Sequence, residues 1–371
     1  MVIRRRYVSA AILCVAIIPG MVFPGLSQAE RATISEQTPV TTIAAYQPNP
    51  QLEGRLAISG SDTMKPLLRR LAGDFTAQHP RVKLAIEGGG GGGSKEFEGS
   101  GSTQGIREFV MGISSQRRGD KARGTGHEGA AKVTVLASSR QLSDEERKHF
   151  VSHFGYEPIP FPVAMDAVAI YVHQSNPVAS LSLDQLAGIF GEEASAQRIE
   201  TWGQAGVKDL ADQPIHLYGR DKRSGTRDFF VDMALHGHRM KGSITEKPGS
   251  ASEVLAISQD PLGIGYAGIG FNRSDVRIVP LQDAGGSIVP PSLQAVTTES
   301  YPLSRTLWLY INQEPNTKYD PVLLEFLRYV NSPRGQAMVA TAQAYPLPES
   351  VVAKNHALLN GASVTAMRSR P

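Results

Sequence analysis

Residues 55–86, RLAISGSDTMKPLLRRLAGDFTAQHPRVKLAI, carry the pattern that decides the fold. Residues 55–59 are typical of a strand, and so are residues 82–86. Between them, residues 64–78 place apolar side chains at helical spacing on one face, namely Leu67, Leu68, Leu71 and Phe75. The sequence therefore predicts a strand, a helix and a strand in succession. Such a unit favours a parallel sheet that binds ligands at the ends of its strands.

Two long apolar segments divide the rest of the chain. Residues 162–172 are almost continuously apolar, as in a strand buried on both faces, and residues 301–311 form a second long strand. The segment between them has its own predicted helix at 181–190 and strand at 261–266, and one or two closing helices are predicted within 320–342. We therefore expect an α/β protein of two lobes. The expected boundaries are 52–168 and 300–345 for lobe 1, 169–299 for lobe 2, 30–51 for a flexible leader and 346–371 for a C-terminal tail.

The first 29 residues are typical of a cleavable signal peptide. Arg4, Arg5 and Arg6 precede an apolar run over residues 10–25, and the small residues of Ser27-Gln28-Ala29 supply a cleavage box. The one cysteine, Cys14, lies in the apolar run without the small residues that a lipoprotein cut requires. We expect a periplasmic or secreted protein with no lipid anchor and no disulfide.

The charge balance argues against a polyanionic partner. Removing residues 1–29 takes away three of the 38 Lys and Arg and none of the 35 acids, so the remaining charges of opposite sign are equal in number. A nucleic-acid partner is therefore not expected, and neither is binding to an anionic membrane surface.

The segment from Leu217 to Arg227 has the features of an anion site. It reads as the end of a strand, a loop and the start of a helix near Thr226. Arg220 offers a planar fork of donors, and Ser224, Gly225 and Thr226 can direct hydroxyls and backbone N–H groups at a tetrahedral oxyanion on the positive end of that helix. An ordinary Ser-Thr helix cap with surface arginines explains the same pattern.

A run of six glycines, Gly88 to Gly93, permits close approach of the backbone to a ligand. It contains a GxGxxG pattern, but no clear helix follows it as a dinucleotide site requires. A P-loop needs Gly-Lys-Ser/Thr, and here Ser94-Lys95 has the reverse order. We interpret the run as the rim of a cleft.

The order of these segments resembles that of the periplasmic phosphate-binding proteins of ABC-type phosphate uptake, in the type II periplasmic binding-protein superfamily. The matching segments, in family order, are 58–63, the Gly-rich run, 112–115, 163–166, 186–190, 199–202, Arg220 with 224–226, 263–266, 301–305 and 332–336. The resemblance implies a fold in which each of two lobes is a mixed sheet flanked by helices, with a ligand cleft between them. It also implies a receptor without enzymatic activity or cofactor, expected to be a monomer, that passes inorganic phosphate to an ABC permease in the inner membrane.

The resemblance also assigns residues to the phosphate site. Arg220, Ser224, Gly225 and Thr226 would bind the anion from lobe 2. Ser61, Thr63 and the Met64 backbone would bind it from lobe 1. A serine of the Gly-rich region belongs to the site as well, and either Ser94 or Ser102 fits that place.

One departure from the family concerns specificity. The family carries an aspartate shortly before the Gly-x-Ser-Ser segment, where it accepts the proton of hydrogen phosphate, and Val110 occupies that place here. A site made of donors alone would lose its preference for phosphate over sulfate, because sulfate has no such proton. Two acids could restore the preference, Glu108 and Asp166.

Other classes of function have less support in the sequence. The chain has no Gly-x-Ser-x-Gly elbow and no evident Ser, His and Asp set for a phosphatase. His149 with His153, and His236 with His238, lack a third ligand nearby in sequence, so no metal site is expected. A secreted oxyanion-binding receptor or adhesion protein without a transporter remains the alternative.

Overall fold

The computed structural model describes residues 45–87, 101–112, 134–192 and 198–361. Its longest strand, β4 (Ile159–His173), joins two parts of one sheet. Residues 159–167 of β4 pair antiparallel with β11 (Ser304–Ile311), and residues 168–172 pair antiparallel with β7 (Gly263–Gly268). The predicted long buried strand is confirmed, and because its pairing partner changes in mid-strand, it links two parts of the sheet. We call them lobe 1 and lobe 2.

Lobe 1 contains the predicted strand, helix and strand. β1 (Gly54–Gly60) pairs in parallel with β2 (Val82–Glu87) on one side and with β3 (Val135–Ser138) on the other. α1 (Lys65–Gln78) connects β1 to β2 and buries its predicted apolar face in the lobe 1 core. β11 completes the sheet, antiparallel to β3 and β4. This arrangement places the loops after β1 and β3 at one edge.

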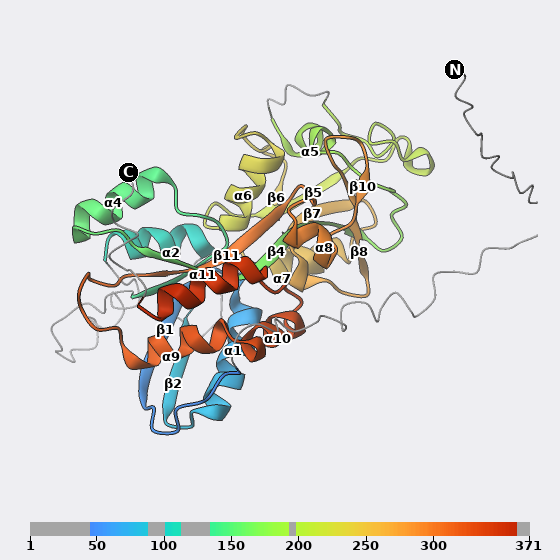
Figure 1. Ribbon diagram of the computed structural model, residues 1–371. Coiled ribbons are helices and arrows are strands. Elements are labelled where there is room, and N and C mark those ends of the chain that lie inside the picture. The colour runs from blue at the N-terminus through green and yellow to red at the C-terminus, as the bar shows by residue number, and fades with distance from the viewer. Residues whose placement is uncertain (1–44, 88–100, 113–133, 193–197, 362–371) are drawn as a thin grey trace, which may run out of the picture. The chain divides into compact units, whose positions relative to one another are not determined.

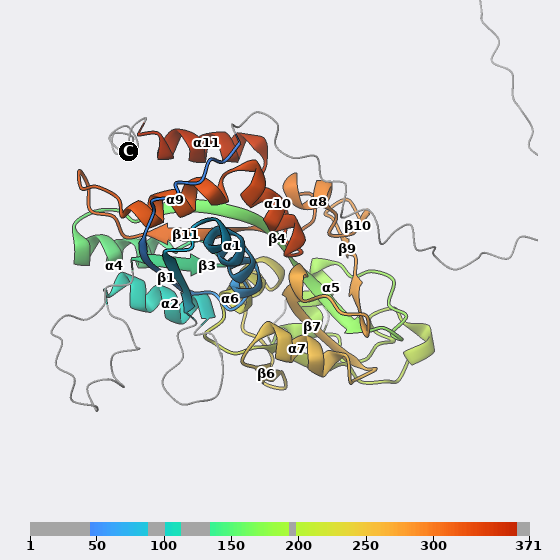
Figure 2. The same ribbon diagram turned by 90° about the horizontal axis from the view of Figure 1, so that it is seen from below.

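Helices cover both faces of the lobe 1 sheet. Figure 2 shows α9 (Pro321–Val330) and α11 (Glu349–Leu359) on one side of β11 and β4, and α2 (Gly101–Val110) on the other. α2 packs with α4 (Asp144–Phe154), and α10 (Pro333–Thr341) packs with α1. Of the one or two closing helices predicted within 320–342, two are present, α9 and α10.

Lobe 2 is built on the second part of β4. Figure 1 shows its strands and helices grouped around this part of β4. Its core contains Trp202, which is fully buried, and a stacked pair of rings, Phe230 and Tyr266, with centroids 4.0 Å apart. Its elements are α5 (Leu183–Phe190), β5 (His216–Arg220), α6 (Gly225–Ala234), β6 (Thr245–Lys247), α7 (Ser250–Ile257), β7, β8 (Val276–Val279), β9 (Leu281–Gln282), β10 (Ile288–Val289) and α8 (Leu293–Thr297).

Three details differ from the sequence-based expectation. β11 begins at Ser304, three residues later than expected, and pairs only within lobe 1. The segment expected to be a tail contains α11, whose Asn355 Nδ2 donates to the Pro162 carbonyl (2.9 Å). In the segment expected to be a flexible leader, the Tyr46 hydroxyl donates to Glu325 (2.9 Å). These contacts join residues far apart in sequence, which local patterns cannot reveal.

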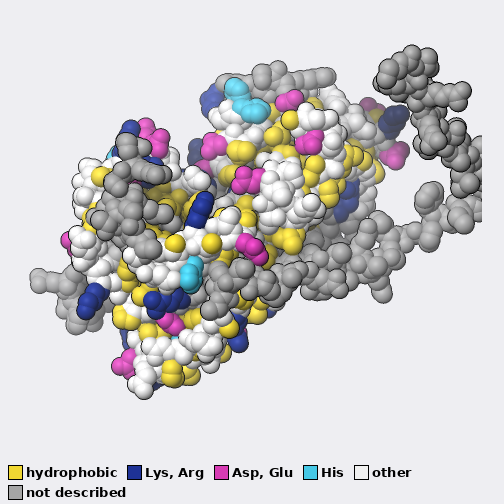
Figure 3. All heavy atoms as spheres, viewed as in Figure 1, with side chains coloured by type: hydrophobic (Ala, Val, Ile, Leu, Met, Phe, Trp, Pro, Cys, Tyr) yellow, Lys and Arg dark blue, Asp and Glu magenta, His cyan; other side chains and the backbone are white. Residues whose placement is uncertain are grey.

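Among the described residues, no helix is both long and apolar enough to cross a bilayer. Figure 3 shows basic and acidic side chains interspersed on the face in view, which fits the balanced charge of the sequence. The predicted signal peptide lies outside the described residues, and so do the glycine run and Ser94.

Candidate functional site

The start of α6 forms one side of the candidate site. β5 ends at Arg220, and Ser224 caps α6 by accepting a hydrogen bond from the Arg227 N–H (3.3 Å). Ser224, Gly225 and Thr226 are all buried, so the positive end of this ten-residue helix is shielded from solvent. The predicted order of strand, loop and helix start is confirmed.

Arg220 extends its guanidinium beside this helix end. The residue is 1% exposed, and its two terminal nitrogens donate to Ser250 Oγ (2.6 Å) and to the Pro248 carbonyl (3.0 Å). Its Nη2 also lies 3.4 Å from Asp62 Oδ2. Within the described residues, the buried Nε has no hydrogen-bond partner. A buried cation with a free donor is costly unless another group, such as an anion, accepts from it.

The turn between β1 and α1 supplies the lobe 1 side. It carries Ser61, which is buried, and Met64 at the start of α1. Thr63 reaches across to lobe 2, where its hydroxyl oxygen lies 2.8 Å from that of Thr226. The residues predicted from both lobes are therefore brought together at Thr63 and Thr226.

The third part of the site joins Ser102 to a residue that the sequence analysis missed. The Ser102 hydroxyl oxygen lies 3.0 Å from that of Ser139 and accepts from the Ser139 N–H (3.1 Å). Gly225 of α6 approaches so closely that an added Cβ would lie 2.5 Å from the Ser102 Cβ and 3.2 Å from the Ser139 hydroxyl oxygen. Ser102, Ser139 and the first turn of α6 therefore meet, and only glycine fits at 225.

The signal for Ser139 was present in the sequence. Ser138 is the last residue of β3 and Ser139 follows it, so a Ser-Ser pair stands at the end of an apolar strand. In the sequence, the Gly-x-Ser-Ser segment of the family matches 112–115 instead. Residues 113–115 lie outside the described part of the chain. Val110, expected in the place of the family aspartate, packs in a small apolar cluster with Phe109.

Among the described residues, neither acid proposed as a proton acceptor has a hydrogen bond to a site hydroxyl. Glu108 accepts from Gln104, one turn earlier in α2 (3.0 Å). Asp166 Oδ2 accepts from Arg305 Nε (2.9 Å) and Nη2 (2.7 Å), and both side chains are nearly inaccessible. The carboxylate that lies beside Arg220 belongs to Asp62, whose Oδ2 is 3.4 Å from Arg220 Nη2.

Arg305 links the buried ion pair to the site. Its Nη1 donates to the Thr226 hydroxyl (3.1 Å), and its guanidinium lies over the Phe229 ring, 5.5 Å from the centroid. Burial lowers the pKa of Arg305, and the carboxylate of Asp166 opposes that effect. The pair thus holds a second cationic donor against Thr226.

Beneath Arg220 lies a buried acid, Glu253. Its Oε1 accepts from the Tyr266 N–H (2.9 Å), and its Oε2 has no partner within the described residues. Burial raises its pKa to about 8, although the charge of Arg220 and the Tyr266 hydrogen bond act in the opposite direction. At neutral pH, Glu253 therefore stays protonated and leaves the charge of Arg220 available.

Glu253 predicts a pH dependence of stability. Its folded pKa lies above the ordinary carboxyl value of 4.5, so its contribution to folding is full below that value and is lost as the pH rises through about 8. We expect Glu253→Gln to flatten the decline of unfolding free energy between pH 6 and pH 9, measured by urea denaturation. Glu314→Gln, in an exposed loop, is the control and should retain the decline. An unchanged pH profile in Glu253→Gln would show that the acid is ionised in the fold.

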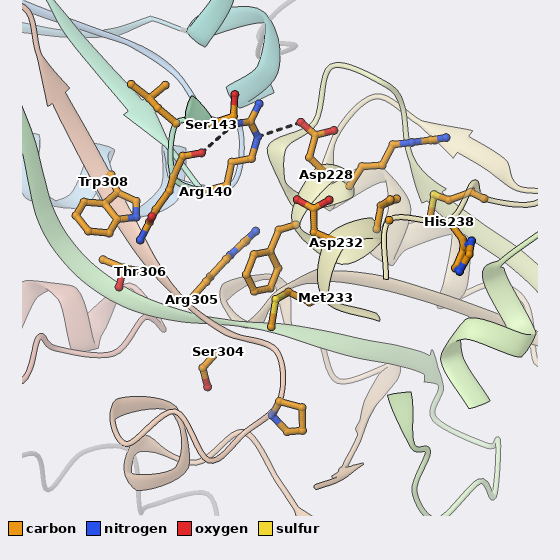
Figure 4. Close-up of a pocket in the computed structure, with 18 of the residues that line it drawn as sticks. Arg140, Ser143, Asp228, Asp232, Met233, His238, Ser304, Arg305, Thr306 and Trp308 are labelled. Carbon is orange, nitrogen blue, oxygen red and sulfur yellow. Dashed lines mark hydrogen bonds and ion pairs between the residues drawn. The ribbon is translucent and has the colours of Figure 1, made fainter. Parts of the chain in front are cut away.

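A cavity of about 1070 Å³ lies next to the site. Figure 4 shows Arg140, Asp228, Asp232, Arg305 and Trp308 around it. Its lining includes residues of both lobes and of the segment leading into β11. Within the described residues, no group of three or more His, Cys, Asp or Glu side chains is placed to hold a metal ion.

Comparisons with known proteins place the chain in a family. A model of the PBP superfamily domain matches residues 28–334. The phosphate-binding protein PstS of Pseudomonas aeruginosa is 34% identical over 314 residues, which cover 83% of this chain and 88% of the relative. The chain belongs to the PBP superfamily. Another relative, protein SphX of Synechococcus elongatus, is 26% identical over 70% of this chain and 68% of its own.

Solved structures share the fold. One is a putative phosphate ABC transporter substrate-binding protein from Clostridium perfringens, with bound phosphate. It matches with a TM-score of 0.60 and 23% identity over 80% of this chain and 100% of its own. An ABC-type phosphate transport receptor from Vibrio cholerae matches with a TM-score of 0.55 and 22% identity over 79% of this chain and 100% of its own. These likenesses confirm the expected two-lobed α/β fold.

Proposed function

We propose that this protein captures inorganic phosphate outside the cytoplasm and delivers it to the permease of an ABC transporter, without chemical turnover. The observation that carries the proposal is Arg220, a buried cation whose Nε has no partner among the described residues, beside the shielded start of α6. The names of the relatives, a phosphate-binding protein and phosphate transport receptors, support phosphate as the ligand. They are binding proteins by name, which supports a receptor rather than a phosphatase.

The proposed contacts come from both lobes. Arg220, Thr226 and the N–H groups of the first turn of α6 would bind the anion from lobe 2. Ser102 and Ser139, together with the turn that carries Ser61, Thr63 and Met64, would bind it from lobe 1. The hydroxyls of Thr63 and Thr226 lie 2.8 Å apart, and those of Ser102 and Ser139 lie 3.0 Å apart. Each of these two pairs can turn toward an anion that enters between the lobes. Fixed donors of this kind replace the water of a dehydrated anion.

Export and partnership form part of the same proposal. A chain released after residue 29 would work in the periplasm or outside the cell, as a monomer that meets its permease at the inner membrane. Balanced charge supports a small anion as the ligand, because a basic surface for nucleic acid is not evident in the composition.

We further assign the proton of hydrogen phosphate to Asp62. This residue lies between the proposed contacts Ser61 and Thr63, and its Oδ2 is 3.4 Å from Arg220 Nη2. Its carboxylate can accept that proton and would repel sulfate, which has no hydrogen to donate. The proposed site thereby has an acceptor as well as donors.

The test is calorimetric titration with phosphate, in the presence and absence of excess sulfate at constant ionic strength. We expect one phosphate per chain and little competition by sulfate. Asp62→Asn should bind phosphate more weakly by about 1 to 3 kcal/mol and admit sulfate as a competitor. Glu108→Gln is the matched control and should behave as the wild type. No phosphate binding by the wild type would refute the proposed function, whereas strong competition by sulfate in the wild type would refute only the role of Asp62.

A further inference from the structure

Asp228 of α6 bonds to two separate segments of lobe 1. Its Oδ2 accepts from the Thr103 hydroxyl (2.6 Å) and from Arg140 Nε (3.0 Å). Thr103 belongs to α2, and Arg140 follows β3, so a single carboxylate oxygen joins three elements. Figure 4 shows the contact between Arg140 and Asp228 at the edge of the cavity.

The partners of Asp228 are sequence neighbours of the proposed phosphate contacts. Thr103 follows Ser102, and Arg140 follows Ser139. Asp228 itself lies two residues after Thr226 in the first turn of α6. The bonds of Asp228 to Thr103 and Arg140 therefore hold Ser102 and Ser139 close to the end of the helix that would bind the anion.

The approach of α2 to the loop before α6 is fixed at a second point. The Thr103 N–H donates to the Arg223 carbonyl (3.1 Å), and a Cβ added to Gly101 would lie 2.1 Å from that carbonyl oxygen. The backbones thus pack with no room for a side chain at 101. The two lobes meet here in one defined register rather than through long side chains alone.

Lobe 1 orients Arg140 by itself. Arg140 Nη1 and Nη2 each donate to Glu146 at 2.8 Å, and Glu146 also accepts from the Ser143 N–H in the cap of α4 (2.8 Å). The two terminal nitrogens of Arg140 are thereby fixed against Glu146 of α4, and the Arg140 Nε is directed at Asp228. A preset donor loses little side-chain entropy when the lobes meet.

We propose that Asp228 is a positioning residue that holds Ser102 and Ser139 against the first turn of α6 while phosphate is bound. The inference rests on the proposed function and extends it to a residue that does not touch the anion. An ordinary surface ion pair would contribute little to affinity. Here the bond lies between lobes and next to the site, so its loss should appear as faster release of phosphate.

The experiment compares Asp228→Asn with Asp232→Asn. Asp232 lies one turn further along α6, lines the same cavity, and makes no hydrogen bond or ion pair within the described residues. We expect Asp228→Asn to raise the Kd for phosphate roughly tenfold to a hundredfold, mostly through the dissociation rate in stopped flow. Asp232→Asn should stay within about twofold of the wild type.

A double-mutant cycle with Arg140→Gln separates positioning from general stability. A positioning role predicts a coupling between Arg140 and Asp228 in phosphate affinity that is larger than their coupling in thermal unfolding without phosphate. Equal phosphate affinity in Asp228→Asn and Asp232→Asn would overturn the inference while the proposed function stands. A wild type that binds no phosphate would overturn both.

Discussion

Arg220→Met is expected to abolish high-affinity phosphate binding. The substitution removes the buried charge beside the start of α6 and the free Nε donor, so a dehydrated anion would lack its main counter-charge. Truncation of one partner in a buried charged contact typically costs about 2 to 5 kcal/mol, which corresponds to a Kd roughly thirtyfold to several-thousandfold higher. Calorimetric titration with phosphate measures this loss.

Lys222→Met is the matched control for that result. Lys222 is an exposed residue of the same loop, so its substitution removes the same charge without touching the buried site. It should bind phosphate nearly as tightly as the wild type. Equal affinities for Arg220→Met and the wild type would mean that the anion binds elsewhere.

Asp166→Ala is expected to cause the largest loss of stability. The substitution leaves Arg305 buried without its carboxylate, close to the charge of Arg220. Breaking a buried ion pair by removing one partner costs about 3 to 5 kcal/mol. Urea unfolding at neutral pH would show the effect as a lower midpoint with a similar slope.

Asp275→Ala provides the exposed counterpart. Asp275 forms a similar pair with Arg273, 2.8 Å apart, on the surface. Water screens such a pair, so its loss should change the unfolding midpoint little. Similar midpoints for Asp166→Ala and Asp275→Ala would show that Asp166 is a ligand-facing acid rather than the structural partner of Arg305.

The elements with strong local patterns could be predicted from the sequence. The spacing of Leu67, Leu71 and Phe75 defined α1, and the apolar run of β4 defined the strand that links the lobes. Arg220 and the cap at Ser224 were also recognised, because an anion site at a helix start depends on consecutive residues. Local sequence was sufficient where local geometry carried the chemistry.

The remaining features depend on contacts between distant segments. The sequence contains two Ser-Ser pairs, at 114–115 and 138–139. Only the pairing of β3 beside β1 brings Ser139 to Ser102. Likewise, the ion pair of Asp166 with Arg305 depends on the register between β4 and β11, which the sequence does not show. α11 lacks a clear apolar stripe, and it is held by side-chain amides such as Asn355 that bond to distant carbonyls.

The most direct test of the account is a crystal structure of the protein grown with phosphate. We predict one tetrahedral anion, with oxygens within hydrogen-bonding distance of Arg220, Thr226 and the serines Ser102 and Ser139, and with donors from both lobes. An anion found only in the cavity beside Arg140 and Trp308, or no anion between Thr63 and Thr226 at saturating phosphate, would contradict the account.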